Sequence, residues 1–280
     1  MGVRGTWIWV GAALLACLSA SAQGVPSLRI AGTGAGMALL KVLGARYEKQ
    51  HPGAKVTVFP SLGSTGGIRA VADGRIEIAC ASRGLSSQEA GLGLAQWTFA
   101  RTPFVLAVGS SRPETDLPQA HIADVYAGRV RAWRNGDPVR VILRPRSDTA
   151  HAQLAAFGPD LEAALTLAHA VPGAITATTD QDCADHLERA SGAVGTLSLG
   201  QILAEQRDLR PLGLGGVKPT LENLARGTYP HATVLRLVVR RARAGTELRR
   251  FLKFLESQPS QDVMRRYGYL PSASAWEPNL

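Results

Sequence analysis

Two periodicities alternate along the hydrophobic and polar positions of this chain. Residues 37–50 place Leu39, Leu40 and Leu43 at the spacing of one helix face, whereas residues 55–59 are rich in β-branched and aromatic side chains typical of a strand. In the first part of the chain we expect strands at 28–32, 55–59 and 75–81 and helices at 37–50 and 67–72. This alternation predicts a mostly parallel sheet with helices on its faces.

The pattern continues after a polar, turn-rich stretch at residues 109–121, which we interpret as the passage into a second lobe. The expected strands are 103–108, 139–144, 193–197 and 234–240, and the expected helices are 149–157, 182–190, 220–226, 247–256 and one more before residue 267. We therefore predict lobe 1 at residues 23–104 and 233–280 and lobe 2 at residues 105–232. The sequence has no visible internal repeat.

The N-terminus has the pattern of an export signal. Arg4 precedes an apolar run at residues 7–18, and Ala20-Ser21-Ala22 follows as a cleavage site of small residues. We predict a signal peptide at residues 1–22 and a periplasmic protein without a membrane span. A second interpretation is a lipoprotein anchored through Cys17, because Leu14-Leu15-Ala16-Cys17 loosely resembles a lipobox.

Composition narrows the class of partner. The chain has 31 Lys and Arg against 22 Asp and Glu, an excess that suits a small anion, an anionic membrane or nucleic acid. Export argues against nucleic acid, and a solvated basic surface such as residues 240–243 accounts for much of the excess. Cys80 and Cys183 are too few for a disulfide framework, and the histidines lack paired spacing. We therefore predict neither a metal site nor a cofactor.

Two clusters of small and polar residues stand where a strand gives way to a helix. Residues 63–67 (Gly-Ser-Thr-Gly-Gly) either form a tight turn or bare backbone N–H groups to an anion. Residues 144–149 (Arg-Pro-Arg-Ser-Asp-Thr) combine guanidinium groups with hydroxyls at a helix start, which suits an oxyanion; ordinary capping by Ser147 or Asp148 is the other interpretation. Ligands of α/β sheets bind at such positions, beyond the carboxyl ends of the strands.

These motifs, in this order, resemble the periplasmic phosphate-binding proteins of phosphate ABC transporters. The resemblance covers most of residues 27–272 and is carried by residues 32–36, 63–68, 79–83, 144–149, 216–220, 227–230 and 268–271. It implies an α/β fold of the type II periplasmic binding protein, in which a hinge joins two α/β lobes and the ligand cleft lies between them. It also implies that hydroxyls, backbone N–H groups and an arginine hold a dehydrated phosphate.

Carried over by position, the resemblance implies contacts from Ser64 and from the amides of Thr65 and Gly66 in lobe 1, and from Arg144 in lobe 2. In the family's first binding turn, this chain has Gly36, Met37 and Ala38, which offer only backbone N–H groups. Ser82 stands where some phosphate binders have an aspartate. Without that acid we expect weaker exclusion of sulfate. Asp148, where a serine is common, either orients an arginine or caps the helix. The full candidate oxyanion site is Gly36, Met37, Ala38, Ser64, Thr65, Gly66, Ser82, Arg83, Arg144, Ser147, Asp148 and Thr149.

The resemblance implies a monomeric, exported solute-binding protein that captures inorganic phosphate or a related oxyanion and delivers it to an ABC transporter permease in the inner membrane. An anion sensor that is not coupled to transport is an alternative. A secreted hydrolase with Ser64 as nucleophile is a remote one, because no G-x-S-x-G elbow surrounds Ser64. We expect a binding protein and not an enzyme.

Arg144→Ala tests the second cluster. Loss of a charge-assisted contact should weaken anion binding by about 2 kcal/mol or more. Calorimetric titration measures this difference, and an unchanged affinity would remove Arg144 from the site.

Overall fold

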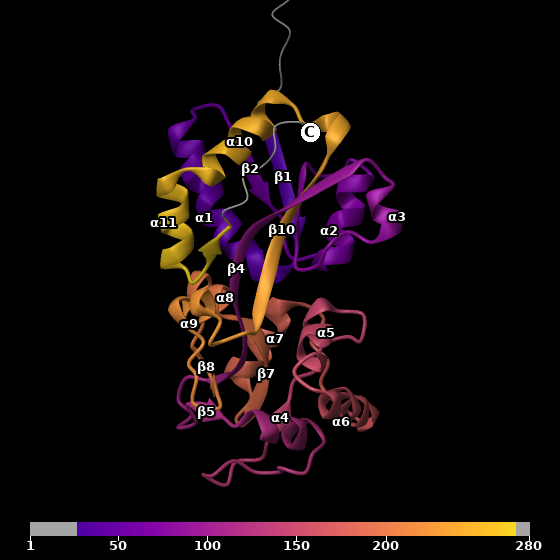
Figure 1. Cartoon of the computed structure of the whole chain (residues 1–280), viewed down its shortest axis with the longest axis vertical. Coiled ribbons are helices and arrows are strands. Elements are labelled where there is room, and N and C mark those ends of the chain that lie inside the picture. The colour runs from indigo at the N-terminus through magenta and orange to yellow at the C-terminus, as the bar shows by residue number, and fades with distance from the viewer. Residues whose placement is uncertain (1–26, 273–280) are drawn as a thin grey trace, which may run out of the picture.

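The computed structural model describes residues 27–272, so the predicted signal peptide and Cys17 lie outside the described residues. Two bodies are stacked along the long axis of the molecule (Figure 1). The upper lobe has its buried apolar side chains within residues 28–100 and 235–269, and the lower lobe has them within residues 104–229. Among the described residues no helix is both long enough and apolar enough to cross a membrane.

The upper lobe is a sheet with helices on both faces. Its strand order is β2-β1-β3-β10-β4, in which β1 pairs in parallel with β2 and β3, while β10 pairs antiparallel with β3 and β4. The elements are β1 (Ser27–Gly32), α1 (Gly34–Gln50), β2 (Lys55–Val58), α2 (Gly63–Ala72), β3 (Ile78–Ala81), α3 (Ser87–Ala90), β10 (Ala232–Arg240), η1 (Arg241–Arg243), α10 (Thr246–Glu256), α11 (Gln258–Arg266) and β11 (Leu270–Pro271).

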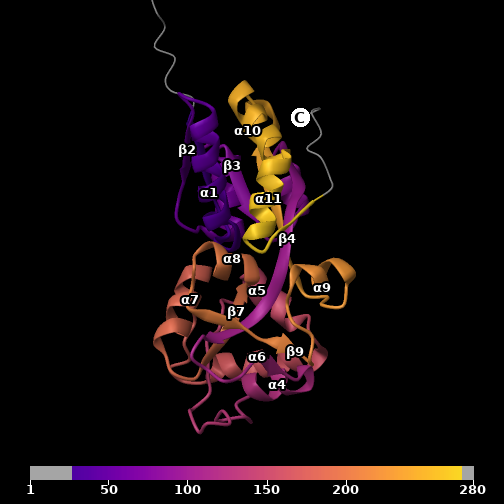
Figure 2. The same cartoon turned by 90° about the vertical axis from the view of Figure 1, so that its left-hand side faces the viewer.

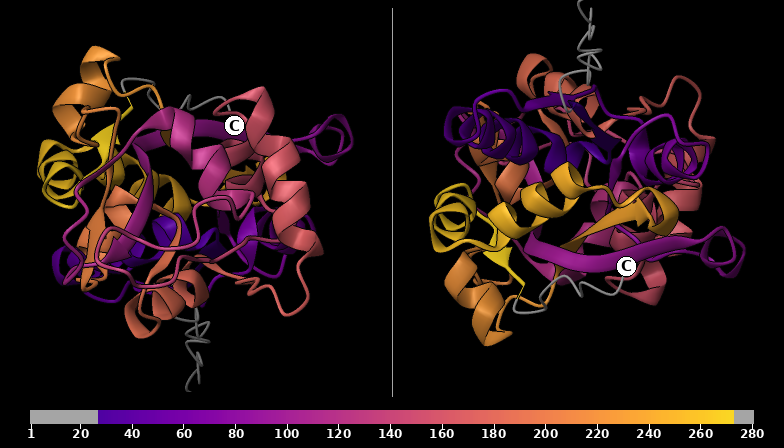
Figure 3. Two further views of the ribbon diagram at one scale, coloured as in Figure 1. Left: turned by 90° about the horizontal axis from the view of Figure 1, so that it is seen from below. Right: turned by 90° about the horizontal axis from the view of Figure 1, so that it is seen from above.

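Strand residues of the upper lobe alternate between two cores. Ile30 and Ile78 pack into the core under α1, α10 and α11, whereas Ala31 and Ala79 face the core under α2. Helices α1, α10 and α11 contact one another, and the view from above in Figure 3 shows α10 running across this lobe. Both faces of the sheet are therefore covered, as its apolar sequence requires.

The lower lobe is built around β4 (Leu94–Gly109), which enters it from the upper lobe, and around β7 (Ala193–Ser198), which pairs antiparallel with β4. The other elements are β5 (Asp116–Leu117), α4 (Gln119–Tyr126), β6 (Arg140–Val141), α5 (Thr149–Ala155), α6 (Pro159–Ala170), α7 (Asp180–Arg189), α8 (Leu199–Ala204), β8 (Leu209–Pro211), β9 (Gly213–Leu214) and α9 (Leu221–Arg226). Figure 2 shows β4 as one curved strand that runs through both lobes.

The structure corrects several of the elements expected from the sequence. The sheet is mixed, because β10 and β4 run antiparallel to their neighbours. β4 begins at Leu94, nine residues before the expected strand, because polar side chains such as Gln96 and Arg101 are exposed and interrupt the apolar pattern. α4 begins within the stretch expected to be a turn-rich passage, and α6 lies in a region to which no element was assigned.

The carboxyl ends of β1 and β3 face the lower lobe, and close backbone contacts fix the turns there. Gly32 has φ +143, and a Cβ at this position would lie 1.9 Å from the carbonyl oxygen of Cys80. A Cβ at Gly67 of α2 would lie 2.8 Å from Cα of Gly32. Helix α2 can therefore approach the end of β1 because Gly67 lacks a side chain, and the missing side chain of Gly32 leaves room for the backbone of Cys80 in β3.

Gly67→Ala should lower the free energy of unfolding by about 1–3 kcal/mol, because the added methyl group pushes α2 away from β1. The control is Gly91→Ala: Gly91 is exposed, has φ −70, and its nearest contact for a Cβ is 3.4 Å away. That change should stabilise the protein by about 0.4–1 kcal/mol. Urea denaturation compares the two variants, and equal effects would contradict the role of close packing.

Candidate functional site

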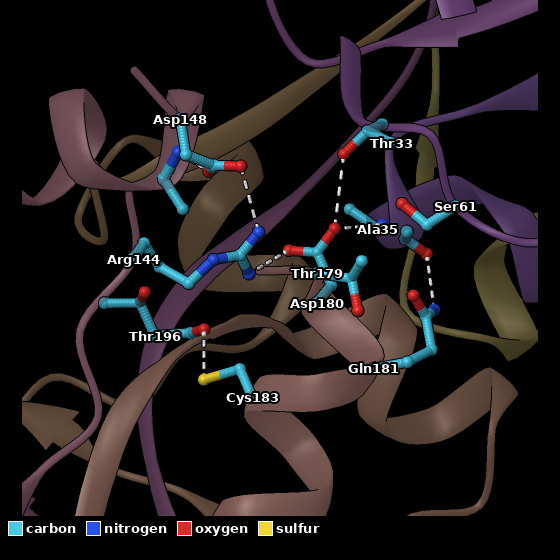
Figure 4. Close-up of polar contacts among 12 residues, drawn as sticks. Thr33, Ala35, Ser61, Arg144, Asp148, Thr179, Asp180, Gln181, Cys183 and Thr196 are labelled. Atoms are coloured by element: carbon cyan, nitrogen blue, oxygen red, sulfur yellow. Dashed lines mark hydrogen bonds and ion pairs between the residues drawn. The ribbon is translucent and has the colours of Figure 1, made fainter. Parts of the chain in front are cut away.

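One carboxylate bridges the two lobes at the carboxyl edge of the upper sheet (Figure 4). Asp180 is the first residue of α7 in the lower lobe. Its Oδ2 accepts hydrogen bonds from the backbone N–H of Ala35 at 3.1 Å and from Oγ1 of Thr33 at 3.4 Å, both in the upper lobe. Its Oδ1 accepts from Nη1 of Arg144 at 2.9 Å. Donors from a helix start, a hydroxyl and a guanidinium thus converge on one negatively charged group.

Arg144 is almost completely buried, with a side-chain exposure of 3%. Its Nη2 donates to Oδ2 of Asp148 at 3.0 Å, and Asp148 also caps α5 by accepting from the N–H of Ala150 at 2.7 Å. Burial opposes the charged form, but the attraction of Asp180 and Asp148 outweighs it and raises the pKa of Arg144. The guanidinium therefore stays charged between two carboxylates. Asp148 has both of the roles that the sequence left open.

The first lobe contributes a pair of hydroxyls on the same edge. Ser64, in the first turn of α2, accepts from the N–H of Ser82 at 2.9 Å and lies 3.0 Å from the hydroxyl oxygen of Ser82. The loop before α2 is fixed to the end of β1, because the hydroxyl of Ser61 donates to the carbonyl of Gly32 at 3.1 Å. Ser64 and Thr33 therefore stand on adjacent turns of the upper lobe.

Arg83 is paired within its own lobe. Its guanidinium forms a two-pronged contact with Glu89, at 2.7 and 2.8 Å, and also donates to Oγ1 of Thr65 at 3.1 Å. The hydrogen bond from Arg83 is the main reason that the pKa of Glu89 falls to about 2. The donors of Arg83 on this side are therefore already engaged by Glu89 and Thr65.

The remaining candidates stand near the starts of α1, α2 and α5 or in the turn before α5. α1 begins at Gly34, three residues before its expected start, so the N–H that reaches the site is that of Ala35, while Gly36 donates to the carbonyl of Thr33 at 3.2 Å. Gly66 is in the first turn of α2, Thr149 begins α5, and Ser147 is exposed. Met37 and Ala38 line an open cavity of about 750 Å³ together with Ser61, Thr179 and Gln181.

The sequence reading missed Thr33, Ala35 and Asp180. Helix α7 is capped by Thr179 and begins at Asp180, two residues before the start expected from the sequence, so Asp180 lay outside the predicted helix. One signal was present at Gly34, where a Cβ would lie 2.4 Å from Oε1 of Gln181 and 2.7 Å from Oδ2 of Asp180. A glycine is therefore needed at this position for the contact with the other lobe.

The site offers no activated nucleophile. The hydroxyl of Ser64 has hydroxyl and amide partners from Ser82 and no basic side chain. Burial raises the pKa of Cys80 and of Cys183 to about 12, which keeps both thiols protonated. Within residues 27–272 no group of three or more His, Cys, Asp and Glu side chains is placed to hold a metal ion.

Comparison with known proteins finds a family model, a curated relative and solved structures that each match most of this chain. The PBP superfamily domain matches residues 19–258 of this chain. The phosphate-binding protein PstS of Bacillus subtilis is 24% identical over 253 residues, which cover 88% of this chain and 80% of that protein. A substrate-binding protein of Clostridium perfringens, solved with bound phosphate, superposes with a TM-score of 0.75 at 19% identity over 88% of this chain and 99% of its own. An ABC-type phosphate transport receptor of Vibrio cholerae gives a TM-score of 0.61 at 23% identity over 88% and 100%.

The ion pair between Arg83 and Glu89 should make the stability of the fold sensitive to acid. Because the folded-state pKa of Glu89 is about 2, below its ordinary value, this pair stabilises the fold above about pH 4.5 and loses its effect as the pH falls toward 2. Since both side chains are partly exposed, we expect Glu89→Gln to remove about 1 kcal/mol of stability at pH 6 and little at pH 2.5. Urea denaturation at both pH values measures this.

Glu222→Gln is the matched control, because it removes an ion pair with Arg226 whose side chains are both more than half exposed. It should change the unfolding free energy by less than about 0.5 kcal/mol at either pH. An equal loss for Glu89→Gln at both pH values would contradict the assigned role of the charge.

Proposed function

We propose that this chain, which belongs to the PBP superfamily, is an exported solute-binding protein that captures inorganic phosphate between its lobes and presents it to an ABC transporter permease. Its place of action is the periplasm, it works as a monomer, and it catalyses no reaction. Phosphate as the ligand is supported by relatives from Bacillus subtilis and Vibrio cholerae that are named for phosphate binding or transport.

The observation that carries the proposal is the convergence of donors on Asp180. The N–H of Ala35, the hydroxyl of Thr33 and the guanidinium of Arg144 surround one carboxylate and come from both lobes. The same donors suit the oxygens of a phosphate, because helix starts and arginine side chains bind carboxylates and phosphates alike. Ser64 and Ser82 supply hydroxyls on the adjacent turn.

Capture requires the lobes to move as bodies. We place their boundaries at residues 23–104 and 233–280 for lobe 1 and 105–232 for lobe 2. The division of the buried apolar side chains into groups within residues 28–100 and 235–269 and within residues 104–229 supports this division. Strands β4 and β10, which pair from Leu94 to Pro103 in β4, are the connections about which the lobes rotate.

A carboxylate of the site bears on ligand choice. Ser82 brings no acid, but Asp148 accepts a hydrogen bond from Arg144 and supplies one. A phosphate that carries a proton can donate it to a carboxylate, whereas fully ionised sulfate cannot. We therefore expect phosphate to bind more tightly than sulfate, which revises the expectation based on Ser82 alone.

Calorimetric titration of the mature protein with phosphate, sulfate, molybdate and small phosphonates tests the function. We expect saturable binding of one phosphate per chain and weaker binding of sulfate. Ser64→Ala should weaken phosphate binding about fivefold, corresponding to about 1 kcal/mol for one hydrogen bond. Ser87→Ala, an exposed serine at the start of α3, should leave it unchanged.

Absence of heat and of any competition with phosphate across the whole panel would overturn the proposal. Tighter binding of molybdate or of a phosphonate than of phosphate would keep an oxyanion-binding protein but change its ligand.

A further inference from the structure

The terminal donors of Arg144 and the donors of Thr33 and Ala35 are already paired with side-chain carboxylates, whereas the buried Nε of Arg144 has no hydrogen-bond partner among the described residues. Of the two terminal nitrogens of Arg144, Nη1 donates to Asp180 and Nη2 donates to Asp148. The N–H of Ala35 and the hydroxyl of Thr33 also donate to Asp180. An oxyanion that used these donors would have to displace Asp180 first.

The contacts of Asp180 run across the gap between the lobes. Its Oδ2 is held by the upper lobe and its Oδ1 by Arg144 of its own lobe. The neighbouring Gln181 adds a hydrogen bond from its Nε2 to the carbonyl of Gly34 at 3.3 Å. Gly34 has no side chain to hold this helix start away, since a Cβ there would lie 2.7 Å from Oδ2 of Asp180. The start of α7 therefore lies directly against the start of α1.

We propose that Asp180 is an internal competitor for the oxyanion: it occupies the donors of the site when no ligand is bound and holds the lobes together there. This inference rests on the proposed function. In this proposal Asp180 sets the affinity of the site. When the ligand binds, it replaces the carboxylate of Asp180 at the donors.

Competition of this kind has a quantitative consequence. The apparent dissociation constant equals the intrinsic one divided by the fraction of protein in which the site is open to ligand. If the internal contact is nine-tenths populated, the apparent affinity is lowered about tenfold. Removing the charge of Asp180 restores that factor for every oxyanion, because the competitor excludes phosphate and sulfate equally.

A different role for Asp180 predicts the opposite sign. If its carboxylate accepted the proton of a bound phosphate, neutralising it would weaken phosphate binding and leave sulfate binding unchanged or stronger. The direction of the change in phosphate affinity therefore separates a competitor from a ligand contact.

The experiment compares the wild type with Asp180→Asn and Asp180→Ala, and with Asp160→Asn as control. Asp160 is exposed in the first turn of α6, so this control removes the same charge from the same lobe away from the site. Phosphate and sulfate affinities are measured by calorimetry. Lobe separation is measured by energy transfer between dyes on Lys49→Cys and Thr166→Cys, both exposed positions, because native Cys80 and Cys183 are buried.

We expect Asp180→Asn and Asp180→Ala to bind phosphate about tenfold more tightly than the wild type and to have a larger lobe separation without ligand, which phosphate then closes. Asp160→Asn should match the wild type in both measurements. Equal or weaker phosphate binding by both Asp180 variants would overturn the proposal, as would an unchanged lobe separation.

The two proposals fail in different ways. If neither the wild type nor the variants bind any oxyanion, the proposed function fails, and the dye measurement still decides whether Asp180 holds the lobes together. If the wild type binds phosphate and the Asp180 variants match it, the function stands and the competitor is excluded.

Discussion

Strong donors that are buried between two bodies must find an acceptor, and this requirement organises the structure. The start of α1 leaves backbone N–H groups without partners inside the helix, and the guanidinium of Arg144 is buried to 3% exposure. An unpaired charge in such a place is costly, and removing one partner of a buried pair typically costs about 3–5 kcal/mol. Asp180 and Asp148 satisfy the charge, and in doing so Asp180 joins one lobe to the other.

The fold brings these groups together through the edge of one sheet. β1 and β3 run in parallel, so their carboxyl ends present Thr33 and Ser82 on the same side. Gly67 lets α2 lie close to that edge, which places Ser64 beside Ser82. The lower lobe supplies Arg144 and the two helix starts that carry Asp148 and Asp180. A small number of residues thus defines the site, and the backbone at strand ends and helix starts sets where each of them lies.

Much of this arrangement was accessible from the sequence, because the signals were local. Hydrophobic periodicity predicted β1, α1, β7 and α10 to within a few residues, and the Arg144 turn stood out through its residue types. The pairing of Arg144 with Asp180, 36 residues further along the chain, depends on tertiary structure, and Asp180 lay outside the helix expected from the sequence. The upper half of β4 was missed because the exposed side chains of Gln96 and Arg101 interrupt its apolar pattern.

The position of β10 also bears on how the protein acquires its structure. This strand lies between β3 and β4 in the upper sheet, yet it comprises residues 232–240, after the whole lower lobe. The sheet of the upper lobe cannot be completed until nearly the entire polypeptide is available, and its central pairings close loops of more than a hundred residues. Such long-range pairings make folding slow. The lower lobe, whose strands and helices lie within one uninterrupted stretch apart from the shared β4, can assemble first and serve as the platform on which the other half is finished.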